Sequence, residues 1–185
     1  MADAQEGADA GRESGTHAFL GLGSNLGDRL VNLQEAVDRL ARVPRVRVVR
    51  CSRVYETEPV GPPQPDYLNA VVEVVTTATA RDLLRACLEV EDRMGRMRTE
   101  RWGPRVVDID LLTFGDEEID EADDVDLTVP HPRMHERLFV LAPLLELTAD
   151  PPLPGGRNVA SVRLGGATLR GVRPFAPPLR VPSSA

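Results

Sequence analysis

The order in which the hydrophobic pattern changes along the chain constrains the fold more than any other feature of the sequence. Short apolar runs typical of strands alternate with stretches whose apolar residues recur at helical spacing. The expected strands cover residues 17–23, 46–56, 67–76 and 106–114, and a helix is expected after the first and after the third. The order strand, helix, strand, strand, helix, strand predicts a ferredoxin-like α+β sandwich, with helices packed on a mainly antiparallel sheet.

Both expected helices have recognisable apolar faces and boundaries. The faces consist of Leu30, Leu33, Val37 and Leu40 in the first helix, and of Leu83, Leu84, Cys87, Leu88 and Met94 in the second. Thr79 is a plausible N-cap of the second helix, and Gly95 a plausible end. A further helix is expected to begin near Pro132 and to be interrupted at Pro143, because proline removes a backbone donor.

Length and composition predict one domain between two loosely structured ends. The chain has 185 residues, enough for one domain with a substantial core. Residues 1–16 are small and polar, without the pattern of a signal peptide, and we expect a flexible N-terminal segment before a domain over residues 17–150. Residues 151–185 are rich in proline and glycine, which indicates a loosely held tail. Without a long apolar segment, we expect a cytoplasmic monomer that does not enter the membrane.

The composition excludes several classes of function. The net charge of −7 argues against general nucleic-acid binding, which needs excess basic side chains. All 22 basic residues are arginine, which excludes the Gly-Lys-Ser/Thr phosphate loop and any lysine Schiff base. Cys51 and Cys87 lack the spacing of metal ligands, and we expect both to be small core residues.

The last expected strand carries two carboxylates inside an apolar run. Asp108 and Asp110 alternate with Val107, Ile109 and Leu111, so the two aspartates share one face, about 6 to 7 Å apart. Two ionised carboxylates on a half-buried surface are costly unless a cation lies near them. A divalent metal is one candidate for that cation. The alternatives are solvated aspartates at a strand end, or aspartates paired with nearby arginines.

Charge is unevenly distributed around this strand. Five arginines and one acid lie in the segment from Arg93 to Arg105 inclusive, directly before the two aspartates. Farther on, the segment DEEIDEADDVD at 116–126 holds eight acids in eleven residues, but it lacks the ligand spacing of a calcium loop. We expect a solvated loop there. The arginines could therefore bind phosphate or pair with this acidic loop.

The glycines near the N-terminus do not form a dinucleotide fingerprint. Gly21 and Gly23 fit G-x-G-x-x-G, but Leu26 stands where the third glycine belongs. No acid closes a following strand about 20 residues on, as that fold requires. We expect a tight turn from strand to helix instead.

Five segments together resemble a known family. They are FLGLGSNLGDR, SRVYETEPVG, PDYLNAVVEV, RWGPRVVDIDLLTFGD and LTVPHPRMHERLFVLAPLLEL, in this order. Their order and spacing, over roughly residues 17 to 150, resemble 6-hydroxymethyl-7,8-dihydropterin pyrophosphokinase, whose fold is the ferredoxin-like sandwich. The resemblance implies transfer of pyrophosphate from ATP to the hydroxyl group of the pterin, giving AMP and a pterin diphosphate in folate biosynthesis.

The resemblance also implies roles for individual residues. Asp108 and Asp110 would hold two magnesium ions, and Arg96 and Arg105 would be catalytic. The residues that match positions contacting ATP are Arg96, Arg98, Arg101, Arg105, His131 and Arg137. Guanidinium groups suit this task because they stay charged and donate pairs of hydrogen bonds to phosphate. Some members place a lysine between the second and third of these arginines, where this chain has only Thr99 and Glu100.

The pterin site implied by the resemblance uses few aromatic residues. The matching positions are Thr57, Val60, Tyr67, Asn69, Trp102 and Phe139. Tyr67 and Phe139 would stack on the two faces of the pterin, and Asn69 would bind its edge together with backbone groups. Trp102 would lie on a loop that closes over the site. Core packing is the alternative for these aromatics, especially for Phe139.

Two functions of other classes remain as alternatives. A palm-like nucleotidyl transferase also carries two aspartates on a strand of such a sheet, although the acidic net charge and small size argue against it. A non-catalytic regulatory domain of similar topology is the second alternative, but it would not need arginines concentrated beside two aspartates.

Overall fold

The computed structural model describes residues 15–59, 63–95, 103–121, 126–162 and 171–183. Its strands are β1 (Thr16–Ser24), β2 (Val46–Cys51), β3 (Val54–Thr57), β4 (Tyr67–Thr76), β5 (Asp108–Phe114), β6 (Ile119–Glu121), β7 (Leu127–Val129) and β8 (Arg173–Ala176). Its α-helices are α1 (Arg29–Leu40), α2 (Ala80–Arg93) and α3 (Leu138–Leu144). Short 3-10 turns lie at Met134–Glu136, Pro154–Gly156 and Val159–Ser161.

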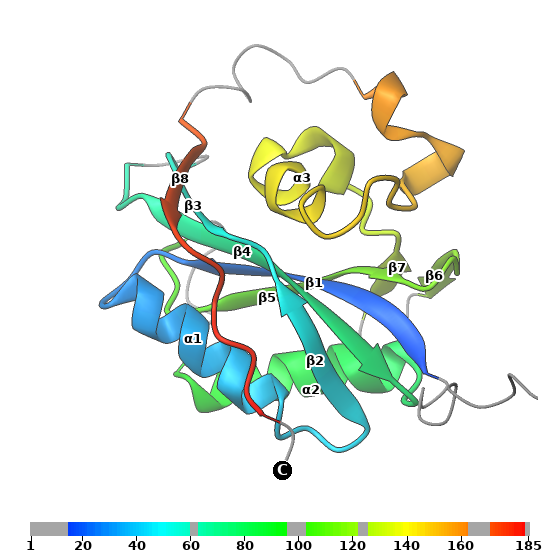
Figure 1. Ribbon diagram of the computed structural model, residues 1–185, viewed down its shortest axis with the longest axis horizontal. Helices are drawn as coiled ribbons and strands as arrows, with labels where there is room; N and C mark the ends of the chain where they lie inside the picture. Colours follow the sequence, from blue (N-terminus) through cyan, green and yellow to red (C-terminus); the bar gives the residue numbers. More distant parts are fainter. Residues whose placement is uncertain (1–14, 60–62, 96–102, 122–125, 163–170, 184–185) are drawn as a thin grey trace, which may run out of the picture.

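One antiparallel sheet organises the molecule. Its strand order is β5-β1-β4-β3-β8, and β2 also pairs with β4. The central strand β1 pairs with β4 on one side and with β5 on the other (Figure 1). This arrangement confirms the predicted α+β sandwich. The expected strand at 46–56 is divided into β2 and β3, which pair with different parts of β4.

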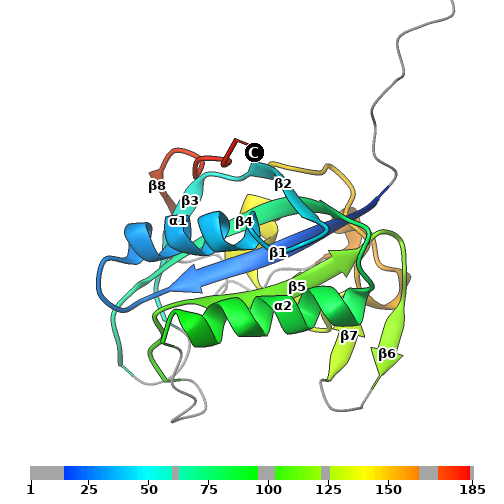
Figure 2. The same ribbon diagram turned by 90° about the horizontal axis from the view of Figure 1, so that it is seen from below.

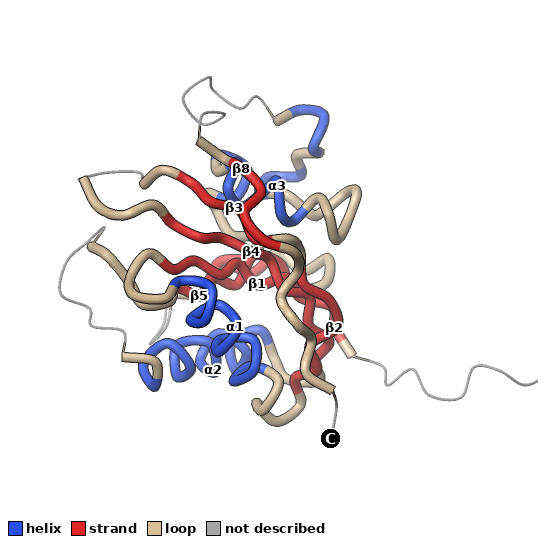
Figure 3. The backbone as a smooth tube through the Cα atoms, turned by 60° about the vertical axis from the view of Figure 1, so that its left-hand side comes forward, coloured by secondary structure: helices blue, strands red, loops and turns tan. Residues whose placement is uncertain are grey.

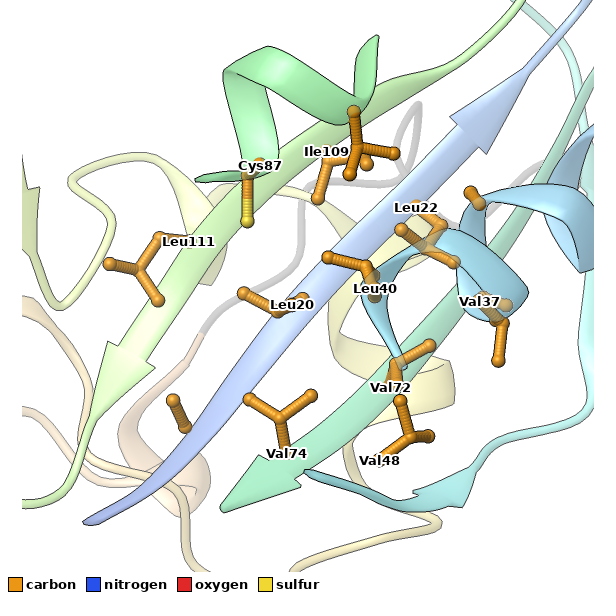
Figure 4. Packing of buried hydrophobic residues seen from close by; sticks show 14 of the residues in the cluster. Leu20, Leu22, Val37, Leu40, Val48, Val72, Val74, Cys87, Ile109 and Leu111 are labelled. Carbon is orange, nitrogen blue, oxygen red and sulfur yellow. The ribbon is translucent and has the colours of Figure 1, made fainter. Parts of the chain in front are cut away.

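Helices α1 and α2 cover one face of the sheet (Figure 2). Alternate residues of each strand point into this core, as in Leu20 and Leu22 of β1 and Val72 and Val74 of β4 (Figure 4). Cys87 of α2 lies in the same cluster, and Cys51 is also buried, which confirms that both cysteines are core residues. The period of two along each strand therefore leaves the intervening side chains on the opposite face.

The opposite face is covered at one end by α3 (Figure 3). Phe19 of β1, Val71 of β4 and Leu112 of β5 pack there against α3 and Leu153. Toward the end of β1 the same face has no large apolar side chain on that strand, because Gly21 and Gly23 occupy the positions that follow Phe19. The described candidate site residues lie around these two glycines.

The helix boundaries test the expectations directly. Thr79 caps α2 by accepting a hydrogen bond from the Asp82 backbone, as predicted. Leu30 is 37% exposed, so its assignment to the buried face of α1 was wrong. The third helix begins at Leu138, later than expected, and Pro143 lies inside its last turn. A helix this short loses little from the missing proline donor.

Two loop expectations were also wrong in part. Gly21 and Gly23 lie within β1, and the turn to α1 follows them, with Gly27 at φ 62°. Such a positive φ favours glycine because it has no Cβ. In the acidic segment, Ile119–Glu121 forms β6, which pairs with β7. A strand can form there because its charged side chains project into solvent while its backbone pairs.

The C-terminal segment is attached to the domain where the structure describes it. Strand β8 pairs with the edge of β3, and Leu179 is buried in the core cluster. The Gln34 side chain of α1 also binds the backbone of Arg180 through both its oxygen and its nitrogen. The expectation of a loosely held tail was therefore wrong for residues 171–183, because an otherwise unpaired sheet edge accepts a strand. The division of the chain at residues 16 and 150 stays a prediction.

Candidate active site

Two cross-strand rows define the site at the end of β1. Gly23 pairs with Asn69 of β4 on one side and with Asp108 of β5 on the other. One step farther along the sheet, Gly21 lies between Val71 and Asp110. Neighbouring strands are about 4.8 Å apart, so Asn69 and Asp108 flank a gap of roughly 10 Å over Gly23.

The aspartates share a face, as their spacing predicted. Asp108 and Asp110 are partly exposed, with side chains 26% and 40% accessible. Ile109 and Leu111 point into the core beneath α1 and α2. The strand thus separates charge from apolar surface by alternation alone.

The two glycines leave space above β1 in this site, because they have no side chains. A Cβ atom at Gly23 would lie 3.4 Å from Asn69 Oδ1 and 3.7 Å from Tyr67 Cδ1. A Cβ atom at Gly21 would lie 3.4 Å from the Leu112 side chain. Any side chain at Gly23 would therefore occupy the space between the Asn69 amide and the Asp108 carboxylate. This use of the glycines was missed from the sequence, where they indicated only a turn.

Each aspartate has an arginine beside it. Arg105 Nη1 lies 2.7 Å from Asp108 Oδ1, and Arg137 Nη1 lies 3.7 Å from Asp110 Oδ2. Burial lowers the pKa of Arg137 from its usual value, and Asp110 acts in the opposite direction. In the described part of the acidic segment, residues 116–121 and 126, neither arginine has an ion-pair partner, and Glu121 pairs with Arg81. The arrangement can bind anions and cations together, because arginines suited to anions lie directly beside carboxylates suited to cations.

His131 belongs to the same region. Its backbone N–H donates to the Leu112 carbonyl at 2.7 Å, which fixes it beside β5. Burial, helped by the positive charge of Arg137, lowers the pKa of His131 to about 4. The Arg133 backbone N–H donates to His131 Nδ1 at 3.2 Å. The neutral ring therefore carries its proton on Nε2, from which it can donate to an oxygen ligand.

On the other side of Gly23, three predicted residues lie together. Thr57 and Tyr67 are paired across β3 and β4. Asn69 Nδ2 donates to Thr57 Oγ1 at 2.8 Å in a buried contact. Burial raises the pKa of Tyr67, so its hydroxyl stays neutral. With Nδ2 engaged, the Asn69 amide oxygen faces the space over Gly23.

Phe139 approaches from α3. It is partly buried against the cluster of Phe19 and Leu112, and the Arg137 guanidinium lies 5.8 Å from its ring centre. Phe139 thus serves core packing in part, which was the alternative considered for it. Five other predicted site residues, Val60, Arg96, Arg98, Arg101 and Trp102, lie outside the described residues.

Two supporting residues were missed. Asn25 Oδ1 accepts from the Arg105 backbone N–H at 2.7 Å, and its Nδ2 donates to Gln64 at 3.0 Å, so it joins both sides of the site. Glu91, a buried acid of α2, accepts from the backbone N–H of Ile109, between the two aspartates, at 2.6 Å. A signal for Glu91 existed, since it continues the four-residue spacing of Leu83 and Cys87 on the buried helix face.

Comparison with known proteins decides the family. The model of the 7,8-dihydro-6-hydroxymethylpterin-pyrophosphokinase family matches residues 19–149. The chain belongs to this family. It is 47% identical over 131 residues to the 2-amino-4-hydroxy-6-hydroxymethyldihydropteridine pyrophosphokinase of Bacillus subtilis, covering 70% of this chain and 77% of that relative. Identity to the pyrophosphokinase of Methylorubrum extorquens is 45% over 156 residues, covering 84% of this chain and 90% of the relative.

Solved structures of this family share the fold. A crystal structure of wild-type Plasmodium falciparum HPPK-DHPS superposes with a TM-score of 0.54 at 15% identity, over 72% of this chain and 38% of that one. A further HPPK-DHPS crystal structure, in complex with substrates, gives a TM-score of 0.54 at 14% identity. The matched part is 40% of that longer chain. At these identities the likeness concerns the fold.

The residues present suit divalent cations that take some of their coordinating oxygens from the protein and the others from a bound ligand. Among the described residues no group of three or more His, Cys, Asp or Glu side chains could hold a metal by itself. Magnesium commonly takes only one or two carboxylates and completes its shell with water and phosphate oxygens. Asp108 and Asp110 supply such a pair of carboxylates on one face of β5. The arginines that now pair with them could pair with the phosphates instead. The described residues also include no helix of the length and apolarity needed to cross a membrane.

Proposed function

We propose that this protein transfers the β,γ-pyrophosphoryl unit of ATP to the hydroxyl group of 6-hydroxymethyl-7,8-dihydropterin in folate biosynthesis. Family membership and the names of relatives from several bacteria support this activity. The observation that carries it is the row Asn69–Gly23–Asp108, which puts a buried amide and a carboxylate on opposite sides of a glycine that has no side chain. In this proposal the heterocycle subsite and the phosphate subsite lie on opposite sides of Gly23, roughly 10 Å apart.

On the phosphate side, we propose that Asp108 and Asp110 hold two magnesium ions with ATP. Bound magnesium would neutralise phosphate charge and orient the attacking and leaving oxygens. Arg105 and Arg137 already lie against these carboxylates and could turn to phosphate oxygens when the cations enter. His131 Nε2–H offers a neutral donor that stays neutral at physiological pH. Arg96, Arg98 and Arg101 are proposed to complete the phosphate clamp.

On the heterocycle side, Tyr67 and Phe139 are proposed to stack on the pterin. The Asn69 amide would bind its edge, held in position by its hydrogen bond to Thr57. The backbone at Thr57 and Val60 would complete that edge, and Trp102 would close over it. This arrangement orients the hydroxymethyl group across Gly23 toward Asp108, where the β-phosphorus of ATP must lie for attack.

In the reaction, the pterin hydroxyl releases its proton and its oxygen forms a bond to the β-phosphorus, while the bond from that phosphorus to the oxygen bridging the α-phosphate breaks. AMP and the pterin diphosphate are the products. Removing water from around the phosphates would favour the pterin oxygen over hydrolysis. The palm-like transferase remains the less favoured function, because an aromatic residue and a buried amide, Tyr67 and Asn69, lie across Gly23 from the aspartates.

Product analysis tests this function. Purified protein is incubated with magnesium, ATP and 6-hydroxymethyl-7,8-dihydropterin, and nucleotides and pterins are separated by chromatography. AMP and pterin diphosphate should form in equal amounts, only when pterin is present. ADP with a pterin monophosphate would show an ordinary kinase, and no pterin-dependent consumption of ATP would favour the regulatory domain.

A further inference from the structure

We propose that Arg173 of the C-terminal strand β8 is a positioning residue for the pterin subsite, acting through Glu56 on the strand ends that carry Thr57 and Tyr67. The inference rests on the proposed function, since it assigns the pterin to that subsite. It concerns a part of the chain beyond the match to the family model, which ends at residue 149. In this protein a segment outside the matched region would thus help to shape the site.

Strand β8 is the outer neighbour of β3 (Figure 1). In this pairing Arg173 lies opposite Glu56. Arg173 Nε and Nη2 both donate to Glu56 Oε2, at 3.0 and 2.8 Å. The backbone pairing and this two-nitrogen contact together fix the register of β8 on the edge of the sheet.

A second arginine completes the network from the other side. Arg29, the first residue of α1, lies 3.0 Å from Glu56 Oε1 and donates to the Asp66 carbonyl at 2.9 Å. Arg173 Nη2 also lies 3.6 Å from Asp66 Oδ2. Arg29 stacks over Phe175 of β8 at 5.6 Å. Two arginines therefore bridge β3, β8, α1 and the residue just before β4.

The network acts at the two positions that lead into the subsite. Glu56 directly precedes Thr57, and Asp66 directly precedes Tyr67; Thr57 and Tyr67 are cross-strand partners. Thr57 in turn accepts the hydrogen bond that orients Asn69. A shift of either strand end would therefore reach the groups proposed to bind the pterin edge and face.

The C-terminal segment also touches the chain just after Thr57. Gly171, at φ 84°, lies so close to Glu58 that an added Cβ would meet its side chain at 3.1 Å. The segment 171–176 thus follows β3 past its end, beside the subsite.

Charge balance supports a structural coupling. The side chain of Glu56 is only 14% exposed, and its pKa is lowered chiefly by the hydrogen bond from Arg173, with Arg29 adding to the effect. Without Arg173, this mostly covered carboxylate would depend on Arg29 alone. Arg29 would then be expected to turn toward Glu56 and loosen its hold on the Asp66 carbonyl.

The test compares binding of the two substrates to the full-length protein. Arg173→Ala should weaken binding of 6-hydroxymethyl-7,8-dihydropterin about three- to tenfold by titration calorimetry, because a largely exposed arginine contributes modestly. Binding of a nonhydrolysable ATP analogue with magnesium should change less than twofold. Arg173→Lys, which retains the charge, should recover part of the loss. Arg180→Ala, an exposed arginine of the same segment, is the matched control and should bind both ligands as the unaltered protein does.

A double-mutant cycle isolates the route through Glu56. In a Glu56→Gln background, Arg173→Ala should have a much smaller effect on pterin binding than in the unaltered protein, because the main contact of Arg173 is already weakened and its 3.6 Å pair with Asp66 is what remains. Additive effects, equal weakening of both ligands, or unaltered pterin binding in Arg173→Ala would each overturn the inference while the proposed function stands. If the unaltered protein bound no pterin and formed no AMP, the proposed function would fail and this inference with it.

Discussion

Replacing Gly23 by alanine should separate the stability of this protein from its affinity for pterin. In the unliganded protein the new methyl group would lie 3.4 Å from Asn69 Oδ1 and 3.7 Å from Tyr67 Cδ1, which are ordinary contact distances. Gly23 lies in a strand and is not among the glycines with positive φ. The folded protein can therefore accept the methyl group without a change of backbone.

The magnitude of the stability effect follows from chain entropy. Glycine in a strand is less favourable than alanine by roughly 0.5 to 1 kcal/mol. For a chain of this size that corresponds to an increase in Tm of about 1 to 4 °C. We expect Gly23→Ala to be as stable as the unaltered protein or slightly more so.

The effect on ligand binding should have the opposite sign. The methyl group would occupy the space where the Asn69 amide oxygen meets the edge of the pterin. Losing that hydrogen bond and leaving a buried amide unsatisfied costs about 1 to 3 kcal/mol. Pterin affinity should fall by roughly 5- to 140-fold, at about 1.4 kcal/mol per factor of ten.

Two measurements on the same preparation test the reasoning. Tm is measured by calorimetry, and pterin affinity by titration in the presence of a magnesium–ATP analogue. Gly21→Ala is the matched control, because its methyl group would meet the Leu112 side chain and leave the Asn69 amide uncovered; its effect on pterin affinity should be smaller. Unchanged pterin affinity in Gly23→Ala, or a loss of several degrees in Tm, would refute the proposed geometry of the site.

Three further predictions concern the phosphate side. Asp110→Asn should lower magnesium-dependent kcat by ~10³-fold or more while changing Tm by only a few degrees, since the side chain is 40% exposed; near-normal turnover would contradict the metal role. Arg105→Ala should reduce kcat by ~10³-fold with little change in pterin affinity, measured by steady-state kinetics; a change in KM alone would make it a binding group only. His131, with its pKa lowered to about 4 by burial, contributes stability that is complete above pH about 6.5 and lost as pH falls toward 4. Denaturation of His131→Gln should therefore depend less on pH across this range, and an unchanged profile would show that His131 is not the group responsible.

The local patterns of the sequence determined the main elements and the shared face of the two aspartates. The cap at Thr79 formed as predicted, because side-chain capping depends on residues only three positions apart. The aspartates of β5 share a face because alternation is a property of any strand. These features depend on short-range geometry, which a single chain segment carries by itself.

The family motifs supplied candidates but not their arrangement. Thr57, Tyr67 and Asn69 were expected near one another, and the pairing of β3 with β4 brings them together. The significance of Gly23 could not be deduced from its neighbours in sequence. It depends on the registers of β4 and β5 against β1, which place Asn69 and Asp108 on either side of it.

The tertiary structure alone decided which distant groups support the site. Glu91 reaches Ile109 from a helix packed beneath the sheet, and Asn25 joins Arg105 to Gln64 across it. The segment that holds Arg173 looked unstructured because its proline and glycine content gives no strand pattern. It becomes a strand because β3 offers a free edge and Glu56 offers a carboxylate that Arg173 can bind, and such long-range complementarity exists only after the chain has folded.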